Sequence, residues 1–224
     1  MSETSNSEHE QAVCRECGKP FAARVTRFTS ITGSPMIVVE PVCPDCVRRR
    51  EDSERSSLIE RAVASIPSGF RNFDPKLGRV DVLAKIRRAA EKYPSLYIVG
   101  PWGQCKTRAV CAVAVEHVKL NPSLRVKFCG ADEFSAGLNY GKTLGVINGV
   151  TDCDLLILDD LGVARSTELV LEATFTLINR RYNSGRRVWI TTNYNPKQLD
   201  VRLGDDYGPK IVRRLADMCH LVQI

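Results

Sequence analysis

The segment GPWGQCKT, residues 100–107, lies between a short apolar run, Leu96–Val99, and a helical pattern, Thr107–Lys119, and it constrains the fold more than any other feature. A strand, a glycine-containing loop, Lys-Thr and a helix form the setting of a phosphate-binding loop. In such a loop, backbone N–H groups and the helix N-terminus face the phosphates, while the lysine reaches the terminal oxygens and the hydroxyl binds Mg²⁺. The segment therefore predicts a site for ATP and Mg²⁺. Its candidate residues are Gly100, Gly103, Gln104, Cys105, Lys106 and Thr107.

The loop departs from the usual pattern at Cys105, where the motif has its second glycine. Glycine is used where the backbone needs unusual dihedral angles or comes close to a ligand. We therefore expect Cys105 to strain the loop or to slow ATP hydrolysis. A second Gly-Lys-Thr, at residues 141–143, follows a helical pattern instead of a strand, and we assign no function to it.

A second apolar run ends in two carboxylates, in the segment DLLILDD at residues 154–160. We predict that Asp159 holds the hydrated Mg²⁺, as Thr107 does, and that Asp160 polarises the attacking water. A solvated turn would also explain the sequence Asp-Asp-Leu-Gly. The nucleotide-site interpretation is favoured because the run lies one strand–helix unit after the phosphate-binding loop.

Two later segments carry polar residues with two interpretations each. The run VWITTN ends at Asn193, which either orients the attacking water or caps the next turn. A helical pattern at residues 210–215 contains Arg213 and Arg214, which form either a solvated face or an arginine finger for a neighbouring subunit.

Apolar runs alternate with helical patterns from residue 66 to residue 224, and this alternation predicts an α/β domain with a parallel sheet covered on both faces. The expected strands are residues 96–99, 124–129, 155–159, 188–192 and 220–223. The expected helices are residues 107–119, 133–144, 168–183 and 210–218.

Four of the nine cysteines form two C-x-x-C pairs, Cys14/Cys17 and Cys43/Cys46, which predict a closed structural zinc site in a small module at residues 13–47. A redox dithiol would need one pair at the start of a helix in a βαβ unit, and we expect neither pair there. The other five cysteines are interpreted as small buried hydrophobic residues.

The remaining segments complete the predicted organisation of the chain. Residues 1–12 are rich in Ser and Glu and are expected to be disordered, and the charged residues 48–65 are expected to form a helical linker. The chain has no secretory signal pattern and no apolar run long enough for a membrane, so we expect a cytoplasmic protein. Its net charge of +6 permits a polyanionic partner but does not require one.

These motifs, in this order, resemble the AAA+ ATPases of the bacterial replicative helicase-loader family, which includes the DnaC, DnaI and IstB types. The resemblance begins at Ile66-Pro67-x-x-Phe70 and includes LDDLG at 158–162, NRRY at 179–182 and TTN at 191–193. It implies an ASCE-type P-loop NTPase sheet with strand order 5-1-4-3-2 and an AAA+ domain over residues 66–224. The zinc-ribbon-like N-terminal module is similar to that of some loaders, where it engages the helicase.

The resemblance also implies roles for single residues and partners. Lys106 and Thr107 would form Walker A, Asp159 and Asp160 Walker B, and Asn193 sensor 1. Arg214 would be the finger in trans, with Arg213 as its fallback. The implied partners are a hexameric replicative helicase, single-stranded DNA and further copies of the chain on ATP binding.

Three functions remain open from the sequence. The first is an ATP-dependent loader or remodeller of a replicative helicase during DNA replication, and the second is an IstB-like accessory ATPase of a transposon or prophage. The third is a zinc-ribbon adaptor that binds nucleotide as a switch and scarcely hydrolyses it, which Cys105 favours. Possible DNA contacts are Arg125, Lys127 and Lys142, with Phe134 and Tyr140 as stacking or core residues.

Overall fold

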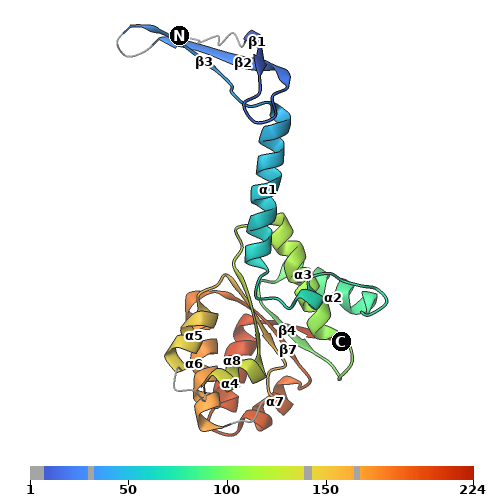
Figure 1. Ribbon diagram of the computed structural model, residues 1–224. Helices are drawn as coiled ribbons and strands as arrows, with labels where there is room; N and C mark the ends of the chain where they lie inside the picture. Colours follow the sequence, from blue (N-terminus) through green and yellow to red (C-terminus); the bar gives the residue numbers. More distant parts are fainter. Residues whose placement is uncertain (1–7, 30–32, 139–142, 164–166) are drawn as a thin grey trace. The chain divides into compact units, whose positions relative to one another are not determined.

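The computed structural model describes residues 8–29, 33–138, 143–163 and 167–224 (Figure 1). The chain divides into two compact units, residues 1–57 and residues 58–224, and each unit is described by itself. The division falls inside the segment 48–65 that the sequence predicts to be a helical linker. The helix there is α1 (Pro44–Ala62), which begins earlier and ends earlier than expected.

The second unit contains a five-stranded sheet with the order β5-β6-β7-β4-β8. Its strands are β4 (Leu96–Val99), β5 (Val126–Gly130), β6 (Leu155–Asp159), β7 (Arg187–Thr192) and β8 (His220–Gln223). All four neighbouring pairs are parallel. Numbered within this unit, the order is 5-1-4-3-2, so the predicted parallel α/β fold and its strand order are confirmed.

Helices cover both faces of this sheet (Figure 1). Leu96 and Ile98 of β4 pack in one buried cluster with side chains of α2 and α3. Tyr97 and Val99 pack in a second cluster with side chains of α4, α5, α6 and α8. Because successive side chains of a strand point to opposite faces, a strand between two helical layers must be apolar throughout, as β4 is. The helices are α2 (Val80–Lys92), α3 (Lys106–Leu120), α4 (Ala131–Leu138), α5 (Thr143–Thr151), α6 (Glu168–Ser184), α7 (Pro196–Leu203) and α8 (Gly208–Met218), after a short 3₁₀ turn, η1 (Ser68–Phe70).

The helices differ from the sequence-based expectation in three places. The helix expected over residues 133–144 has different outer bounds, because α4 begins at Ala131 and α5 extends to Thr151, and residues 139–142 lie outside the described part of the chain. Helix α2 was not expected, although it buries Val82, Leu83, Ile86 and Ala89 on one face. Helix α7 was also not expected, and Asn195 starts it with a capping box. Among the described residues, no helix combines the length and apolar character that a membrane crossing requires.

The first unit contains an antiparallel sheet with the order β1-β2-β3, followed by α1. Its strands are β1 (Glu8–Val13), β2 (Pro20–Thr29) and β3 (Pro35–Val39). The expectation of disorder over residues 1–12 is therefore wrong from Glu8 onward, because β1 pairs with β2 along its whole length. Residues 1–7 lie outside the described part of the chain.

Candidate nucleotide site and four-cysteine cluster

The phosphate-binding loop leaves β4 at Gly100 and enters α3 at Lys106. Cys105 has φ 58° and ψ 28°, which is the left-handed conformation that glycine adopts freely. A residue with a Cβ in this conformation costs about 1–2 kcal/mol. Cys105 therefore takes the backbone shape that the motif normally assigns to glycine, and the loop carries a local strain there.

Gly100 is required for a different reason, which is close backbone approach. A Cβ at this position would lie 2.9 Å from the Cβ of Ile224 and 3.0 Å from its carbonyl oxygen. The backbone N–H of Ile224 donates to the carbonyl of Val99 at 2.7 Å, so the end of β8 is fixed beside the loop. A side chain at residue 100 would displace one of these two segments.

Lys106 is buried, and its ammonium group donates three hydrogen bonds. The acceptors are the carbonyls of Gly100 and Pro101, each at 2.9 Å, and Oδ1 of Asn193 at 2.8 Å. Burial lowers the pKa of Lys106, and the nearby charges of Asp160 and Asp159 oppose that effect. The bond to Asn193 links the phosphate-binding loop to the end of β7.

Asp159, at the end of β6, accepts hydrogen bonds from two hydroxyl groups. Thr107 Oγ1 lies 2.9 Å from Oδ1 and 3.1 Å from Oδ2, and Thr191 donates to Oδ1 as well. Burial raises the pKa of Asp159, and the donations from Thr191 and Thr107 oppose it. Because the Thr107 proton points to Asp159, lone pairs of its oxygen stay available to a cation.

Asp160 follows directly and lies in the left-handed region with φ 55°. Its backbone N–H donates to Thr191 Oγ1 at 2.9 Å. The next N–H, that of Leu161, donates to the Thr191 carbonyl at 3.0 Å. The turn after β6 is therefore held by β7.

The carboxyl ends of β6, β7 and β4 meet at one edge of the sheet because these strands are neighbours and parallel. The structure brings Lys106, Thr107, Asp159 and Asn193 together there. A buried ammonium, a hydroxyl and a carboxylate beside a helix N-terminus are the groups that triphosphate and Mg²⁺ require. These residues could therefore hold Mg²⁺-ATP.

Comparison with known proteins places this site in a family. The family described as the bacterial DnaA ATPase domain matches residues 77–207, which is more than half of the chain. The chain belongs to this family. The chromosomal replication initiator protein DnaA of Kosmotoga olearia (strain ATCC BAA-1733 / DSM 21960 / TBF 19.5.1) is 24% identical over 178 residues, 73% of this chain and 40% of that protein. The chain thus spans well under half the length of this relative.

Two solved structures share the fold of the DnaA-type ATPase domain. A candidate primosome component from Streptococcus pyogenes serotype M3 has a TM-score of 0.60 and 20% identity, and the match covers 75% of this chain and 95% of that one. The DnaC helicase loader has a TM-score of 0.51 and 23% identity, with 79% and 89% covered. The predicted resemblance to AAA+ proteins of DNA replication is confirmed.

Arg214 lies on α8, outside the group around Lys106 and outside the region that the DnaA family matches. Its Nε donates to Asn179 Oδ1 at 2.6 Å, and its Nη1 donates to the carbonyl of Lys210 at 3.0 Å. The guanidinium carbon also lies 4.7 Å from the ring centre of Phe175. Arg214 is half-buried by these contacts, whereas Arg213 is exposed.

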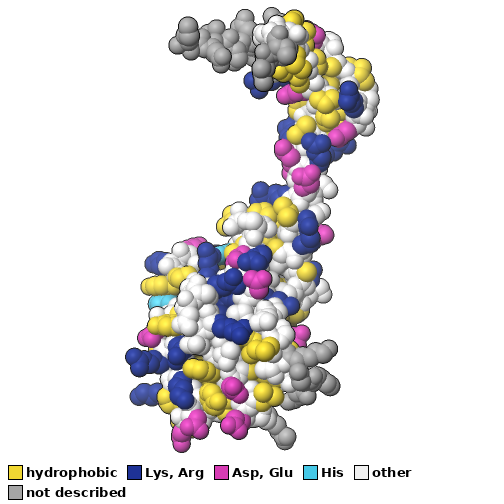
Figure 2. Space-filling model, turned by 90° about the vertical axis from the view of Figure 1, so that its left-hand side faces the viewer, with side chains coloured by type: hydrophobic (Ala, Val, Ile, Leu, Met, Phe, Trp, Pro, Cys, Tyr) yellow, Lys and Arg dark blue, Asp and Glu magenta, His cyan; other side chains and the backbone are white. Residues whose placement is uncertain are grey.

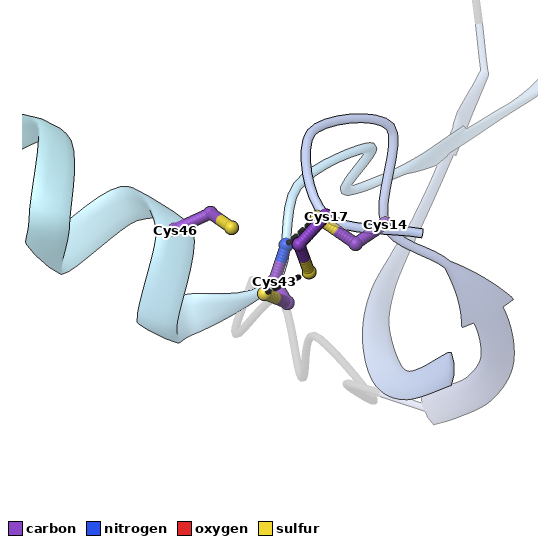
Figure 3. Close-up of side chains that lie close together, drawn as sticks. All are labelled: Cys14, Cys17, Cys43 and Cys46. Atoms are coloured by element: carbon purple, nitrogen blue, oxygen red, sulfur yellow. Dashed lines mark hydrogen bonds between the residues drawn. The ribbon is translucent and has the colours of Figure 1, made fainter. Parts of the chain in front are cut away.

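The four cysteines of the first unit form one cluster, also outside the DnaA-type ATPase domain (Figure 3). All four sulfur atoms lie within 4.8 Å of one another. Sulfur atoms at the corners of a zinc tetrahedron with 2.3 Å bonds are about 3.8 Å apart. The distance of 3.7 Å between the sulfurs of Cys17 and Cys43 has this size. The cluster therefore fits the predicted zinc module.

Each cysteine pair has a different local setting. Cys14 and Cys17 lie in a turn that closes with Gly18 at φ 69°, whereas Cys43 and Cys46 open α1. The second pair therefore begins a helix, which alone is not the setting of a redox dithiol. The helix follows an antiparallel sheet and not a βαβ unit, so the redox setting is still absent from the described part of this unit.

Local groups affect the charge on two of these thiols. The backbone N–H of Cys43 donates to Cys14 Sγ at 3.3 Å and lowers the pKa of Cys14 to about 6. Burial raises the pKa of Cys46 to about 12, against the effect of Arg49, which donates to Cys46 Sγ at 2.8 Å. A cation at the cluster would face a thiolate at Cys14 and a guanidinium beside Cys46.

The residues suggested for DNA contact differ in their burial and in their charged neighbours. Arg125 pairs with Asp154 at 3.0 Å and with Asp152 at 3.6 Å, so neighbouring carboxylates already offset its charge. Phe134 is buried and belongs to the core beside the DnaA-type sheet. Lys127 is half-buried, and Tyr140 and Lys142 lie outside the described residues. On the face drawn in Figure 2, Lys and Arg side chains gather over the second unit with carboxylates between them.

Sequence reasoning missed Thr191 as a site residue. The Thr-Thr-Asn run at residues 191–193 predicts a role for Asn193 alone. A hydroxyl near the end of a strand that is buried from Val188 to Thr192, next to the strand that ends in Asp159, is the signal that could have revealed it. Gly100 is needed because a side chain there would meet Ile224. This contact depends on the path of the chain after β8, so no local sequence signal predicts it.

Proposed function

We propose that this chain is an ATPase that loads or remodels a hexameric replicative helicase on single-stranded DNA. The observation that carries the proposal is the joint network in which Lys106 contacts Asn193 while Thr107 contacts Asp159. It links three strands at the edge where an AAA+ protein binds ATP. Membership of the DnaA ATPase family and the shared fold with the DnaC helicase loader support it.

We assign a role to each residue of the site. Lys106 neutralises phosphate charge, and Thr107 and Asp159 hold Mg²⁺ through a hydroxyl and a carboxylate oxygen. The bound ion supplies charge stabilisation during phosphoryl transfer. Asp160 polarises the attacking water, and Asn193 orients it from the end of β7.

The four-cysteine cluster contributes structure in this proposal. Four thiolates close a tetrahedral zinc site and leave no position open for catalysis. We assign the module to contact with the helicase, as the resemblance to loaders suggests. Oligomers form on ATP binding so that neighbouring subunits complete each other's sites.

The test is steady-state ATP turnover of the full chain with and without single-stranded DNA, with Lys106→Ala as the blank. We expect turnover above the blank that rises when DNA is added. Turnover equal to the blank in both conditions, with ATP still bound, would contradict the ATPase proposal. Turnover that exceeds the blank but does not change when DNA is added would support ATPase activity and contradict the DNA-linked function.

A nucleotide switch with scarce hydrolysis is the second candidate, and the strained conformation of Cys105 favours it. Under this candidate, Cys105→Gly would raise turnover about tenfold, since 1–2 kcal/mol of strain corresponds to roughly that factor. We expect instead a change below about threefold, because the backbone of Cys105 already adopts the glycine-like conformation. The matched control is Cys105→Ala, which removes the thiol and keeps the Cβ. Turnover of both variants decides between the candidates.

Arg214→Ala is expected to lower the turnover of assembled protein about 1000-fold, the usual effect of losing an arginine finger. The nucleotide affinity of the isolated subunit should change less than twofold. Asn179→Ala is the control, because it removes the in-chain partner of Arg214 and keeps the guanidinium. If Asn179→Ala reproduces the loss, Arg214 acts within its own subunit. If Arg213→Ala causes the loss and Arg214→Ala does not, Arg213 is the finger.

A further inference from the structure

Thr191 contacts three successive residues of the turn that carries both carboxylates. Its side chain is fully buried at the end of β7. Its hydroxyl lies 2.5 Å from Asp159 Oδ1 and 2.9 Å from the backbone nitrogen of Asp160. Its carbonyl accepts the N–H of Leu161 at 3.0 Å. One residue of β7 therefore holds the end of β6 at three points.

The direction of each hydrogen bond follows from chemistry. The backbone N–H of Asp160 can only donate, so the Thr191 oxygen accepts it. An ionised carboxylate can only accept, so the Thr191 proton points to Asp159. Charge-assisted O–H···O⁻ bonds are short, about 2.5–2.7 Å, as this one is. The Thr191 hydroxyl therefore bridges the backbone N–H of Asp160 and the carboxylate of Asp159.

The same turn contains the left-handed backbone of Asp160, at φ 55°. For a residue with a Cβ, this conformation lasts only where neighbouring groups hold it in place. The N–H of Asp160 donates to Thr191, and this bond fixes the orientation of its peptide group. Without the hydroxyl, that N–H would lose its partner, and the turn would be free to relax.

The neighbours of Thr191 have different partners. The Thr192 hydroxyl donates to the carbonyl of Leu161 at 2.7 Å, and Asn193 accepts from Lys106. Thr192 is as deeply buried as Thr191 but contacts neither carboxylate in any recorded hydrogen bond among the described residues. It is therefore a matched control for the loss of a buried hydroxyl.

We propose that Thr191 is a positioning residue, which holds the carboxylate of Asp159 beside Thr107 and fixes the turn that aims Asp160. The inference rests on the proposed nucleotide site, but the turn geometry itself does not depend on ATP. It predicts that the hydroxyl, and not the methyl group, is the part of Thr191 that matters for the Mg²⁺-dependent step.

The experiment compares three variants of the full chain with wild type. Thr191→Val removes the hydroxyl at nearly constant volume, Thr191→Ser keeps it, and Thr192→Val removes the neighbouring hydroxyl. Three quantities are measured on each: nucleotide affinity with and without Mg²⁺, kcat for ATP, and the hydrogen-exchange rate of the Asp160 amide without nucleotide.

In Thr191→Val, the factor by which Mg²⁺ increases nucleotide affinity should be about tenfold smaller than in wild type, and kcat should be at least tenfold lower. The nucleotide affinity measured without Mg²⁺ should change less than twofold. Its Asp160 amide should exchange at least tenfold faster. Thr191→Ser should restore all three quantities to within about threefold. Thr192→Val should lower thermal stability but leave the Mg²⁺ dependence and the Asp160 exchange rate near wild type.

Two results would overturn the inference. One is a Thr191→Val protein with wild-type Mg²⁺ dependence and Asp160 exchange, and the other is a Thr191→Ser protein as impaired as Thr191→Val. Failure of the proposed function looks different, because wild type itself would then show no ATP turnover above the Lys106→Ala blank. In that case the exchange rate of the Asp160 amide still decides whether Thr191 fixes the turn.

Discussion

Replacing Lys106 with alanine is expected to lower nucleotide affinity at least about 100-fold and to abolish ATP turnover, because hydrogen bonds to charged groups contribute about 1.5–3 kcal/mol each. The ammonium group is already desolvated and held by three acceptors at the start of α3. Phosphate oxygens would replace the carbonyl acceptors with little further loss of hydration. Calorimetric titration with ADP and a non-hydrolysable ATP analogue measures the affinity.

A loss of affinity is informative only if the variant is folded. Removing Lys106 leaves Asn193 Oδ1 without its donor, so some loss of thermal stability is expected. Lys127→Ala, which removes a half-buried lysine on β5 away from the loop, serves as the matched control. If Lys106→Ala binds nucleotide as wild type does, residues 100–107 are not the phosphate-binding loop.

The sequence predicted the sheet closely because its signals are local and repeated. Each expected strand lies within two residues of an observed one, and every strand starts or ends beside a charged or polar segment. The alternation of apolar runs with helical patterns predicts that the strands are parallel, whereas the strand order is what the resemblance to helicase loaders implies. The residues Lys106, Thr107, Asp159 and Asn193 meet because parallel strands end at one edge.

The failures occur where long-range contacts override local composition. Residues 8–13 are polar, which favours disorder, but their backbone pairs with β2, and Glu10 pairs with Arg27 at 3.0 Å. Thr191 was missed because its importance depends on which strand lies beside β7.

Removing the metal from the four-cysteine cluster is expected to unfold the first unit while the second unit keeps its nucleotide affinity. The first unit has a small core among its described residues. Its central buried cluster is Cys14, Cys43 and Cys46, with Cys17, Phe21 and Val42 packed against it. A core of this size does not stabilise a fold without a metal or a covalent link. We therefore expect zinc binding to supply folding free energy for this unit.

Cys43→Ser tests this directly, because the Cys43 sulfur faces that of Cys17 and its backbone N–H bonds to Cys14. Reduced wild type should contain about one zinc per chain. Cys43→Ser should contain less than about a tenth of that, because the closed site needs all four thiolates. Amide exchange over residues 8–57 should become fast, with nucleotide affinity unchanged.

Cys219→Ser removes a thiol outside the cluster and should keep the zinc. A zinc-free wild type with slow exchange over residues 8–57 would show that the four thiols pack without a metal. A loss of nucleotide affinity in Cys43→Ser would show instead that the two units are energetically coupled. Each result identifies a different source for the stability of the first unit, which the spacing of its cysteines attributes to zinc.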